Sequence, residues 1–85
     1  MAKKTDKPSS TNVNKKKVNS EIGLFLRKDA DINSAYLTVM PYGSTVEIID
    51  KHIVVNSGRS WVKCSYKDTT TKYKYTGYAV SAYLS

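Results

Sequence analysis

Cys64 and His52 are the one pair of residues with which a nucleophilic mechanism could be built. The chain contains a single cysteine and a single histidine, and a thiol nucleophile needs a base close by. Period-2 alternation through an expected strand places Cys64 on the face of Val62, opposite to Trp61. We therefore expect a buried, inert thiol, the usual state of a free cysteine in a core. His52 is expected at the surface near a strand end.

Other catalytic chemistry has no residue pattern behind it. One histidine and one cysteine cannot supply the three or four protein ligands of a zinc site. The seven carboxylates show no arrangement that singles out an acid–base pair. The sequence thus predicts neither an enzyme, nor a metal site, nor a cofactor, and a single cysteine excludes an intrachain disulfide.

Binding is better supported, because the chain has seven tyrosines and one tryptophan. A domain of this size cannot bury all of them, and an aromatic ring with a polar group suits contact with a peptide or glycan. Tyr36, Tyr78 and Tyr83 are expected in the core or at its end. Trp61 is either the first ligand contact or a structural cover over the sheet. The tyrosines expected to be exposed for ligand contact are Tyr66, Tyr73 and Tyr75.

The elements that position these residues are short β-rich runs separated by turn residues. No segment has a helical period longer than about two turns, and turn residues recur every 8 to 12 positions, as in small barrels and sandwiches. Gly77 is expected at a bend or a close approach of two chains. The strands are expected at residues 22–27, 35–40, 45–50 with an extension at 52–55, 60–66, 72–76 and 77–80.

The first twenty residues differ from the rest in composition. They carry six lysines and one acid, whereas residues 21–85 carry eight basic and six acidic residues. A segment with so few apolar side chains cannot offset its ordering entropy. We expect residues 1–20 to be a disordered Lys-rich tail or linker, dispensable for folding, before one domain at 21–85. Its lysines either bind phosphates or an anionic wall polymer at low salt, or remain solvated.

The opening residues lack the apolar stretch of a signal peptide, and no run of about 18 apolar residues could cross a membrane. We expect a protein that is made in the cytoplasm, is not addressed for export and has no membrane partner.

Five landmarks in a fixed order resemble the bacterial SH3 (SH3b) domain over about residues 22–85. They are Leu24-Phe-Leu-Arg27, the segment Leu37 to Ile49, Trp61-Val-Lys-Cys64, Thr76-Gly-Tyr-Ala79 and Tyr83-Leu84. The resemblance implies an all-β SH3-like barrel of five to six short antiparallel strands. It also implies a final helical turn that brings Tyr83 and Leu84 back to cap the barrel.

Domains of this family are common at the C-terminal end of peptidoglycan hydrolases, including phage endolysins. The resemblance therefore implies a non-catalytic module that binds peptidoglycan or its cross-bridge peptide and acts at the wall after release, with a catalytic hydrolase chain as a further partner. The alternative is an intracellular adaptor or nucleic-acid-binding protein, in which the lysine tail contacts phosphate and a Tyr/Lys strand stacks on bases. The low net charge of residues 21–85 favours the first.

The chain departs from the family in three loops, at residues 28–34, 52–60 and 67–74, so the family's ligand preference does not carry over directly. The binding groove is expected between the loop after Arg27, the turn before Trp61 and the tyrosines that flank residues 67–74. The loop residues expected to contact ligand are Asp29, Asp31 and Asn33.

Overall fold

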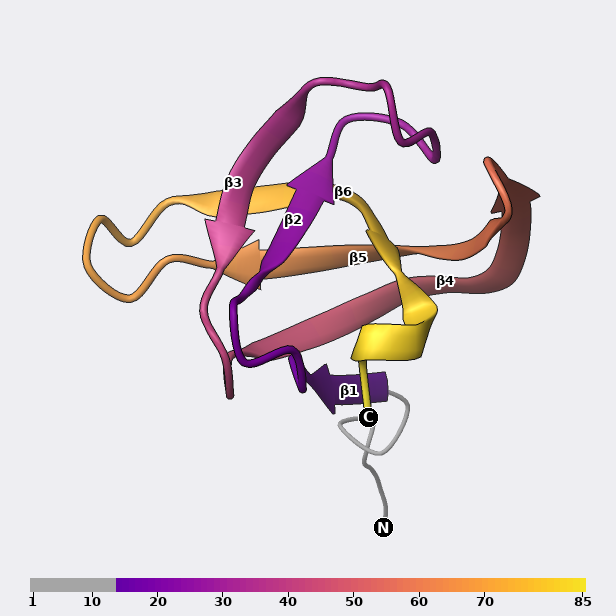
Figure 1. Ribbon diagram of the computed structural model, residues 1–85. Coiled ribbons are helices and arrows are strands. Elements are labelled where there is room, and N and C mark those ends of the chain that lie inside the picture. The colour runs from indigo at the N-terminus through magenta and orange to yellow at the C-terminus, as the bar shows by residue number, and fades with distance from the viewer. Residues whose placement is uncertain (1–13) are drawn as a thin grey trace, which may run out of the picture.

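A computed structural model describes residues 14–85 (Figure 1). Six antiparallel strands form one strongly curved sheet in the order β1-β4-β5-β6-β2-β3. The expected small all-β barrel is confirmed. No helix within residues 14–85 is long and apolar enough to cross a membrane. The elements are β1 (Asn14–Lys17), β2 (Leu24–Arg27), β3 (Tyr36–Met40), β4 (Thr45–Asn56), β5 (Arg59–Lys67) and β6 (Lys74–Val80), followed by a 3₁₀ turn (Ser81–Tyr83).

The long hairpin of β4 and β5 forms one side of the barrel. Its two-residue turn has positive φ at Ser57 (59°) and Gly58 (70°), the conformation that matches the twist of paired strands. The segment 52–60, expected to be longer than in the family, is thus mostly paired strand. The pairing shifts register around Asp50, whose carboxylate accepts a hydrogen bond from the main-chain N–H of the exposed His52.

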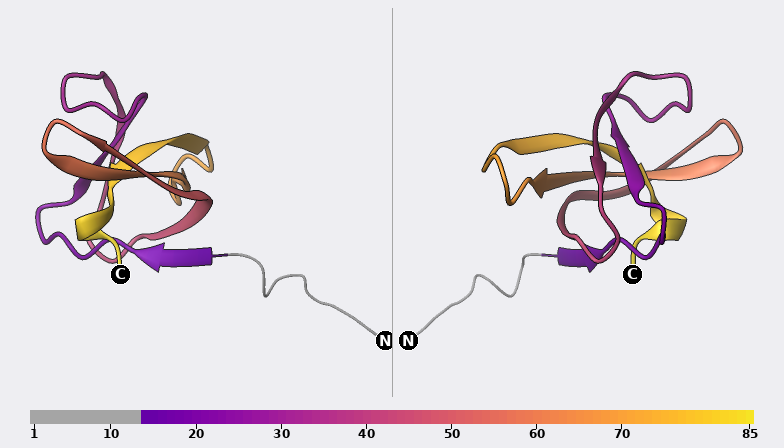
Figure 2. Two further views of the ribbon diagram at one scale, coloured as in Figure 1. Left: turned by 90° about the vertical axis from the view of Figure 1, so that its right-hand side faces the viewer. Right: turned by 60° about the vertical axis from the view of Figure 1, so that its left-hand side comes forward.

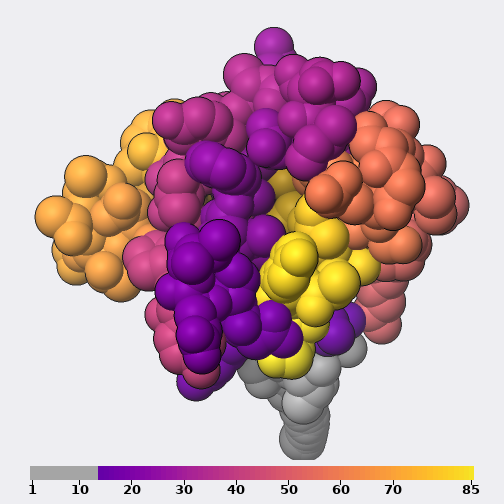
Figure 3. Space-filling view, viewed as in Figure 1, coloured from indigo at the N-terminus to yellow at the C-terminus, as the bar shows by residue number. Residues whose placement is uncertain are grey.

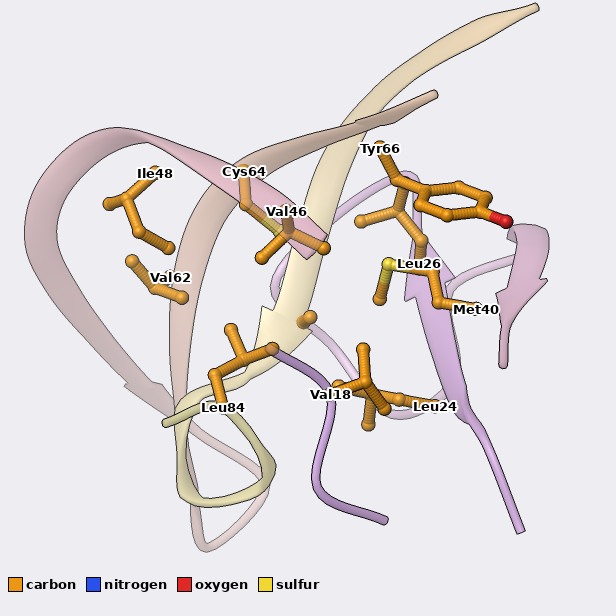
Figure 4. Close-up of a cluster of buried hydrophobic side chains, with 11 residues drawn as sticks. Val18, Leu24, Leu26, Met40, Val46, Ile48, Val62, Cys64, Tyr66 and Leu84 are labelled. Atoms are coloured by element: carbon orange, nitrogen blue, oxygen red, sulfur yellow. The ribbon is translucent and has the colours of Figure 1, made fainter. Parts of the chain in front are cut away.

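The core lies inside the curve of the sheet, where buried side chains from several strands point toward one another (Figure 4). Alternation along β5 sends Val62 and Cys64 inward, as predicted. Tyr66 lies two residues further along the same face and is buried with them, so its expected exposure is wrong. The buried apolar residues of this cluster are Val18, Leu24, Leu26, Met40, Val46, Ile48, Val62, Cys64, Tyr66, Ala79 and Leu84.

The N-terminal boundary expected at residues 20 and 21 is wrong, because the barrel includes residues from Asn14 onward. β1 pairs with β4, and Lys17 exchanges main-chain hydrogen bonds of 2.8 and 2.9 Å with Ser85. An edge strand tolerates lysines because its main chain makes the pairing while the side chains reach solvent. Val18 then enters the core. The rest of the expected tail, residues 1–13, lies outside the described residues.

The chain closes beside β1, where the C-terminal residues lie next to the end of that strand (Figure 2). The expected helical turn is present, and Leu84 is buried against the core and bridges Val18. Tyr83 is 46% exposed and Tyr36 is 56% exposed, so only Leu84 caps the barrel. The expectation that Tyr36 and Tyr83 pack in the core or at the end of the barrel is wrong, because both side chains are exposed.

Gly77 occupies a close approach between two chains, as predicted. β2 crosses β6 there, with Arg27 opposite Tyr78. A Cβ at Gly77 would overlap the main-chain carbonyl oxygen of Arg27. Only glycine allows the two strands to come this near.

Deleting residues 1–19 should destabilise the barrel, whereas a chain that begins at Asn14 should melt within a few degrees of the full chain. The longer deletion removes β1 and the buried Val18. Val18→Ala alone should cost about 2 kcal/mol, a fall of roughly 10 °C in melting temperature for a domain of this size. Thermal unfolding followed by circular dichroism measures the melting temperatures of the two deletions and of Val18→Ala. Equal melting temperatures for the two deletions would contradict the assignment of β1 to the fold.

Cys64→Val should leave stability nearly unchanged at pH 7, because the two side chains are close in volume, but should alter its dependence on alkaline pH. Burial raises the pKa of the Cys64 thiol from 9.0 to about 11. The folded thiol therefore stays protonated after the unfolded one has ionised, so stability is lost as pH rises from 9 toward 11. The native chain should lose about 2 kcal/mol more than Cys64→Val over this interval, measured by urea unfolding. Identical pH profiles would contradict a buried thiol.

Candidate functional site

A cavity of about 460 Å³ opens on the side of β2 and β5 that faces away from the core. The loop 28–34, the β4–β5 hairpin and the 3₁₀ turn surround it, and the surface is hollowed where these segments meet (Figure 3). Most of the lining is apolar or aromatic. It is formed by Ser20, Ile22, Gly23, Leu24, Phe25, Arg27, Ile32, Val39, Arg59, Trp61, Val80 and Tyr83.

Trp61 lies at the bottom of this cavity. Alternation correctly placed it on the face opposite to Val62, but its side chain is only 1% exposed, so it is not the open ligand contact that was expected. The indole Nε1 donates a 3.0 Å hydrogen bond to the main-chain oxygen of Asn56, which supplies the partner that a buried indole N–H needs. Trp61 was expected to be either the first ligand contact or a structural cover over the sheet. Its burial agrees with the structural cover.

Hydrogen bonds tie the walls of the cavity together. The Asn56 side chain donates to the carbonyl oxygen of Ala30 (2.8 Å), which joins the hairpin to the loop 28–34. Arg27 Nη1 donates to the carbonyl oxygen of Ser34 (2.8 Å), which joins the loop to the end of β2. Both bonds use main-chain acceptors, so they depend on the path of the loop rather than on its side chains.

The loop residues expected to contact ligand make hydrogen bonds within the loop. The carboxylate of Asp31 accepts a hydrogen bond from the main-chain N–H of Asn33, and the N–H of Asp29 donates to the Ser34 hydroxyl. None of Asp29, Asp31 and Asn33 lines the cavity, whereas Ile32 does. The predicted loop therefore borders the cavity, and the side chain that it contributes to the lining is that of Ile32.

Aromatic and cationic side chains meet at the mouth of the cavity. Phe25 is 43% exposed, and its ring centroid lies 4.7 Å from that of Tyr36. The guanidinium carbon of Arg27 lies 5.0 Å from the centre of the Phe25 ring, within the range of a cation–π interaction. Arg27 and Arg59 are the charged residues of the lining.

The remaining predicted residues lie at the opposite end of β5. Tyr73 is exposed and Tyr75 is half-buried, and their ring centroids are 4.7 Å apart. Tyr66 borders a second hollow of about 700 Å³ beside Tyr42 and Lys67. The expected groove is thus divided, because the structure unites Trp61 with the loop 28–34 but leaves the tyrosines of the β5–β6 hairpin elsewhere.

The side chains that could act as nucleophile and base are not available to a substrate together. Cys64 has no exposed surface, while His52 is exposed on the irregular part of β4. Among residues 14–85, no group of three histidine, cysteine or acidic side chains is placed to hold a metal ion.

Sequence reasoning missed Phe25, Arg27, Arg59 and Tyr83 as site residues. For the first three the signal was present. Alternation through Leu24-Phe-Leu-Arg27 puts Phe25 and Arg27 on the face away from the core, and the same spacing along β5 puts Arg59 beside Trp61. No comparable signal exists for Tyr83, which reaches the cavity through the 3₁₀ turn.

Comparison with known proteins gives one family match. A family described as the bacterial SH3 domain matches residues 22–85. No curated protein and no solved structure matches the chain. The match covers most of the described barrel, from the residues just before β2 to the C-terminal residue, and includes every landmark on which the resemblance rests. The chain belongs to the bacterial SH3 domain family.

Proposed function

We propose that this barrel is a non-catalytic module that binds bacterial cell wall, with the peptide part of peptidoglycan held in the cavity above Trp61. Bacterial SH3 domains are generally binding modules without catalysis, and binding of cell-wall components is a known role of the family. The finer part of the proposal, the wall peptide and its position, rests on the cavity.

The observation that carries the proposal is the preformed cavity with an aromatic lining. Its volume of about 460 Å³ lies in the range of sites for small ligands and short peptides. Phe25 and Tyr83 stand partly exposed at its rim, where aromatic rings give large contact area at low entropic cost. Because hydrogen bonds already fix its walls, a ligand does not have to order them.

The proposal extends to the protein's setting. We place this module as the wall-targeting part of a phage or bacterial peptidoglycan hydrolase, made in the cytoplasm and acting at the wall after release. A catalytic hydrolase chain is then the natural partner, since a non-catalytic barrel adds activity only by holding an enzyme near its substrate.

Phe25→Ala and Tyr83→Ala should each weaken retention on purified peptidoglycan by about 1 to 3 kcal/mol, the range of an aromatic anchor. Tyr73→Ala is the control, because it removes an exposed aromatic ring from the β5–β6 connection, outside the cavity lining. Trp61→Ala is unsuitable, since loss of a fully buried indole threatens the fold. Sedimentation with wall material measures retention, and circular dichroism checks folding. A loss confined to Tyr73→Ala would move the site to the β5–β6 hairpin.

A second candidate function, the binding of nucleic acid, gains support from the lysines of β1. The three lysines of this strand belong to the barrel, so residues 14–85 carry eleven basic and six acidic residues. Lys15, Lys67 and Lys74 line one shallow surface together with Glu47. Clustered lysines on an open sheet face are suited to the phosphates of nucleic acid. This basic surface is separate from the cavity.

The dependence of binding on salt concentration distinguishes wall binding from nucleic-acid binding. Contacts in the cavity are short-ranged, so retention on peptidoglycan should persist at about 0.3 M salt, where the Debye length is roughly 6 Å. Binding of single-stranded or duplex DNA through the basic surface should disappear there and should weaken in the double variant Lys15→Gln and Lys74→Gln. Filter binding and wall sedimentation at two salt concentrations give the answer. Wall retention that falls with salt and with the lysine variant would replace the cavity by the basic surface.

A further inference from the structure

We infer that the cavity recognises a free peptide carboxylate through Arg27 and Arg59, and that its ligand is a short peptide end rather than the middle of a chain. This inference rests on the proposed function and names the chemical class of its ligand. Two arginines line the cavity and no acidic residue does. A concave site with uncompensated positive charge favours an anion, and its shape admits a chain end.

Arg27 is fixed in a position from which it can bind such a group. Its Nη1 donates to the carbonyl oxygen of Ser34 at 2.8 Å, and its guanidinium lies over the Phe25 ring. A guanidinium has five N–H donors, so most remain for a ligand. Little side-chain entropy is lost when a group already held in this way forms a further bond.

Arg59 faces the same cavity from the start of β5. It is exposed, and its Nη1 makes only a long hydrogen bond of 3.4 Å to the carbonyl oxygen of Ser57. It shares a face of β5 with Trp61, two residues further along the strand. Arg27 and Arg59 therefore approach one cavity from two different strands, and Trp61 lines the same cavity.

A carboxylate suits this site better than the phosphates of a polymer. The cavity has no lysine in its lining and is mostly apolar, whereas Lys15, Lys67 and Lys74 lie on a separate surface. The planar fork of arginine matches a carboxylate with two parallel hydrogen bonds. Apolar walls beside the arginines suit small side chains next to the terminal carboxylate, such as those of alanine.

The acidic residues nearest in sequence do not occupy the site. Glu21 and Asp29 are exposed outside the lining, and one oxygen of Asp31 accepts the N–H of Asn33. They lower the positive potential around the mouth without neutralising either guanidinium within the cavity. The cavity should thus bind a singly charged peptide end more tightly than a long polyanion, which these acidic residues would repel.

The test uses the full chain and the peptide acetyl-Lys-D-Ala-D-Ala, as the free acid and as its C-terminal amide. Trp61 is the single tryptophan, so its fluorescence reports on the cavity. The free acid should bind saturably and the amide at least tenfold more weakly. Arg59→Gln should weaken binding of the acid at least tenfold and leave the amide unchanged. Arg27→Lys, which keeps the charge and loses the fork, should weaken it several-fold. Lys67→Gln, an equal loss of charge elsewhere, should change nothing.

Equal binding of acid and amide, or normal binding by Arg59→Gln with an unchanged melting temperature, would overturn the carboxylate inference. Displacement of the acid by inorganic phosphate at equal concentration would overturn it in favour of a phosphate ligand. Sedimentation with purified peptidoglycan keeps the two proposals apart. Retention that survives Arg59→Gln but not Phe25→Ala upholds wall binding and rejects the carboxylate. Peptide binding without any retention rejects wall binding and upholds the carboxylate.

Discussion

The close approach of Gly77 to the main chain of Arg27 is the constraint on which the rest of the structure depends. β2 pairs with β6 at this crossing, where Arg27 lies opposite Tyr78, and the pairing joins the β2–β3 hairpin to the sheet of β4, β5 and β6. A side chain at position 77 would push the two strands apart. Arg27 also lines the cavity and directly precedes the loop 28–34, so the residue at the crossing belongs to both the barrel and the cavity.

Period-2 alternation predicted which face each residue of β5 takes, but not what covers that face. Val62 and Cys64 point into the core and Trp61 points away, as expected. The burial of Trp61 depends on a hairpin and a loop that approach from elsewhere in the chain, and no local pattern describes them. Tyr66 was misassigned for a different reason. Its neighbours in the long turn suggested exposure, although its parity with Cys64 already indicated the core.

The N-terminal boundary shows where composition misleads. Lysine and asparagine are poor candidates for a buried segment, and residues 14–17 contain nothing else. An edge strand needs only main-chain partners on one side, and β1 finds them on β4 and at Ser85. Val18, one apolar residue in a polar stretch, anchors it. The pairing of β1 with β4 and with Ser85 joins segments far apart in the sequence, so local composition could not predict it. The later strands could be predicted because their own apolar and polar residues alternate.

The same residues stabilise the fold and form the cavity, so the cavity is already built before any ligand is present. Trp61 stabilises the barrel and also forms the cavity floor, and Asn56 links that indole to the loop through one acceptor and one donor. A small barrel has little stability to spare for ordering a mobile loop when ligand arrives. Here the loop is held before binding by bonds that belong to the folded state. In the proposed binding, the aromatic rim and the two arginines contribute to affinity without first offsetting the entropy of closing the site.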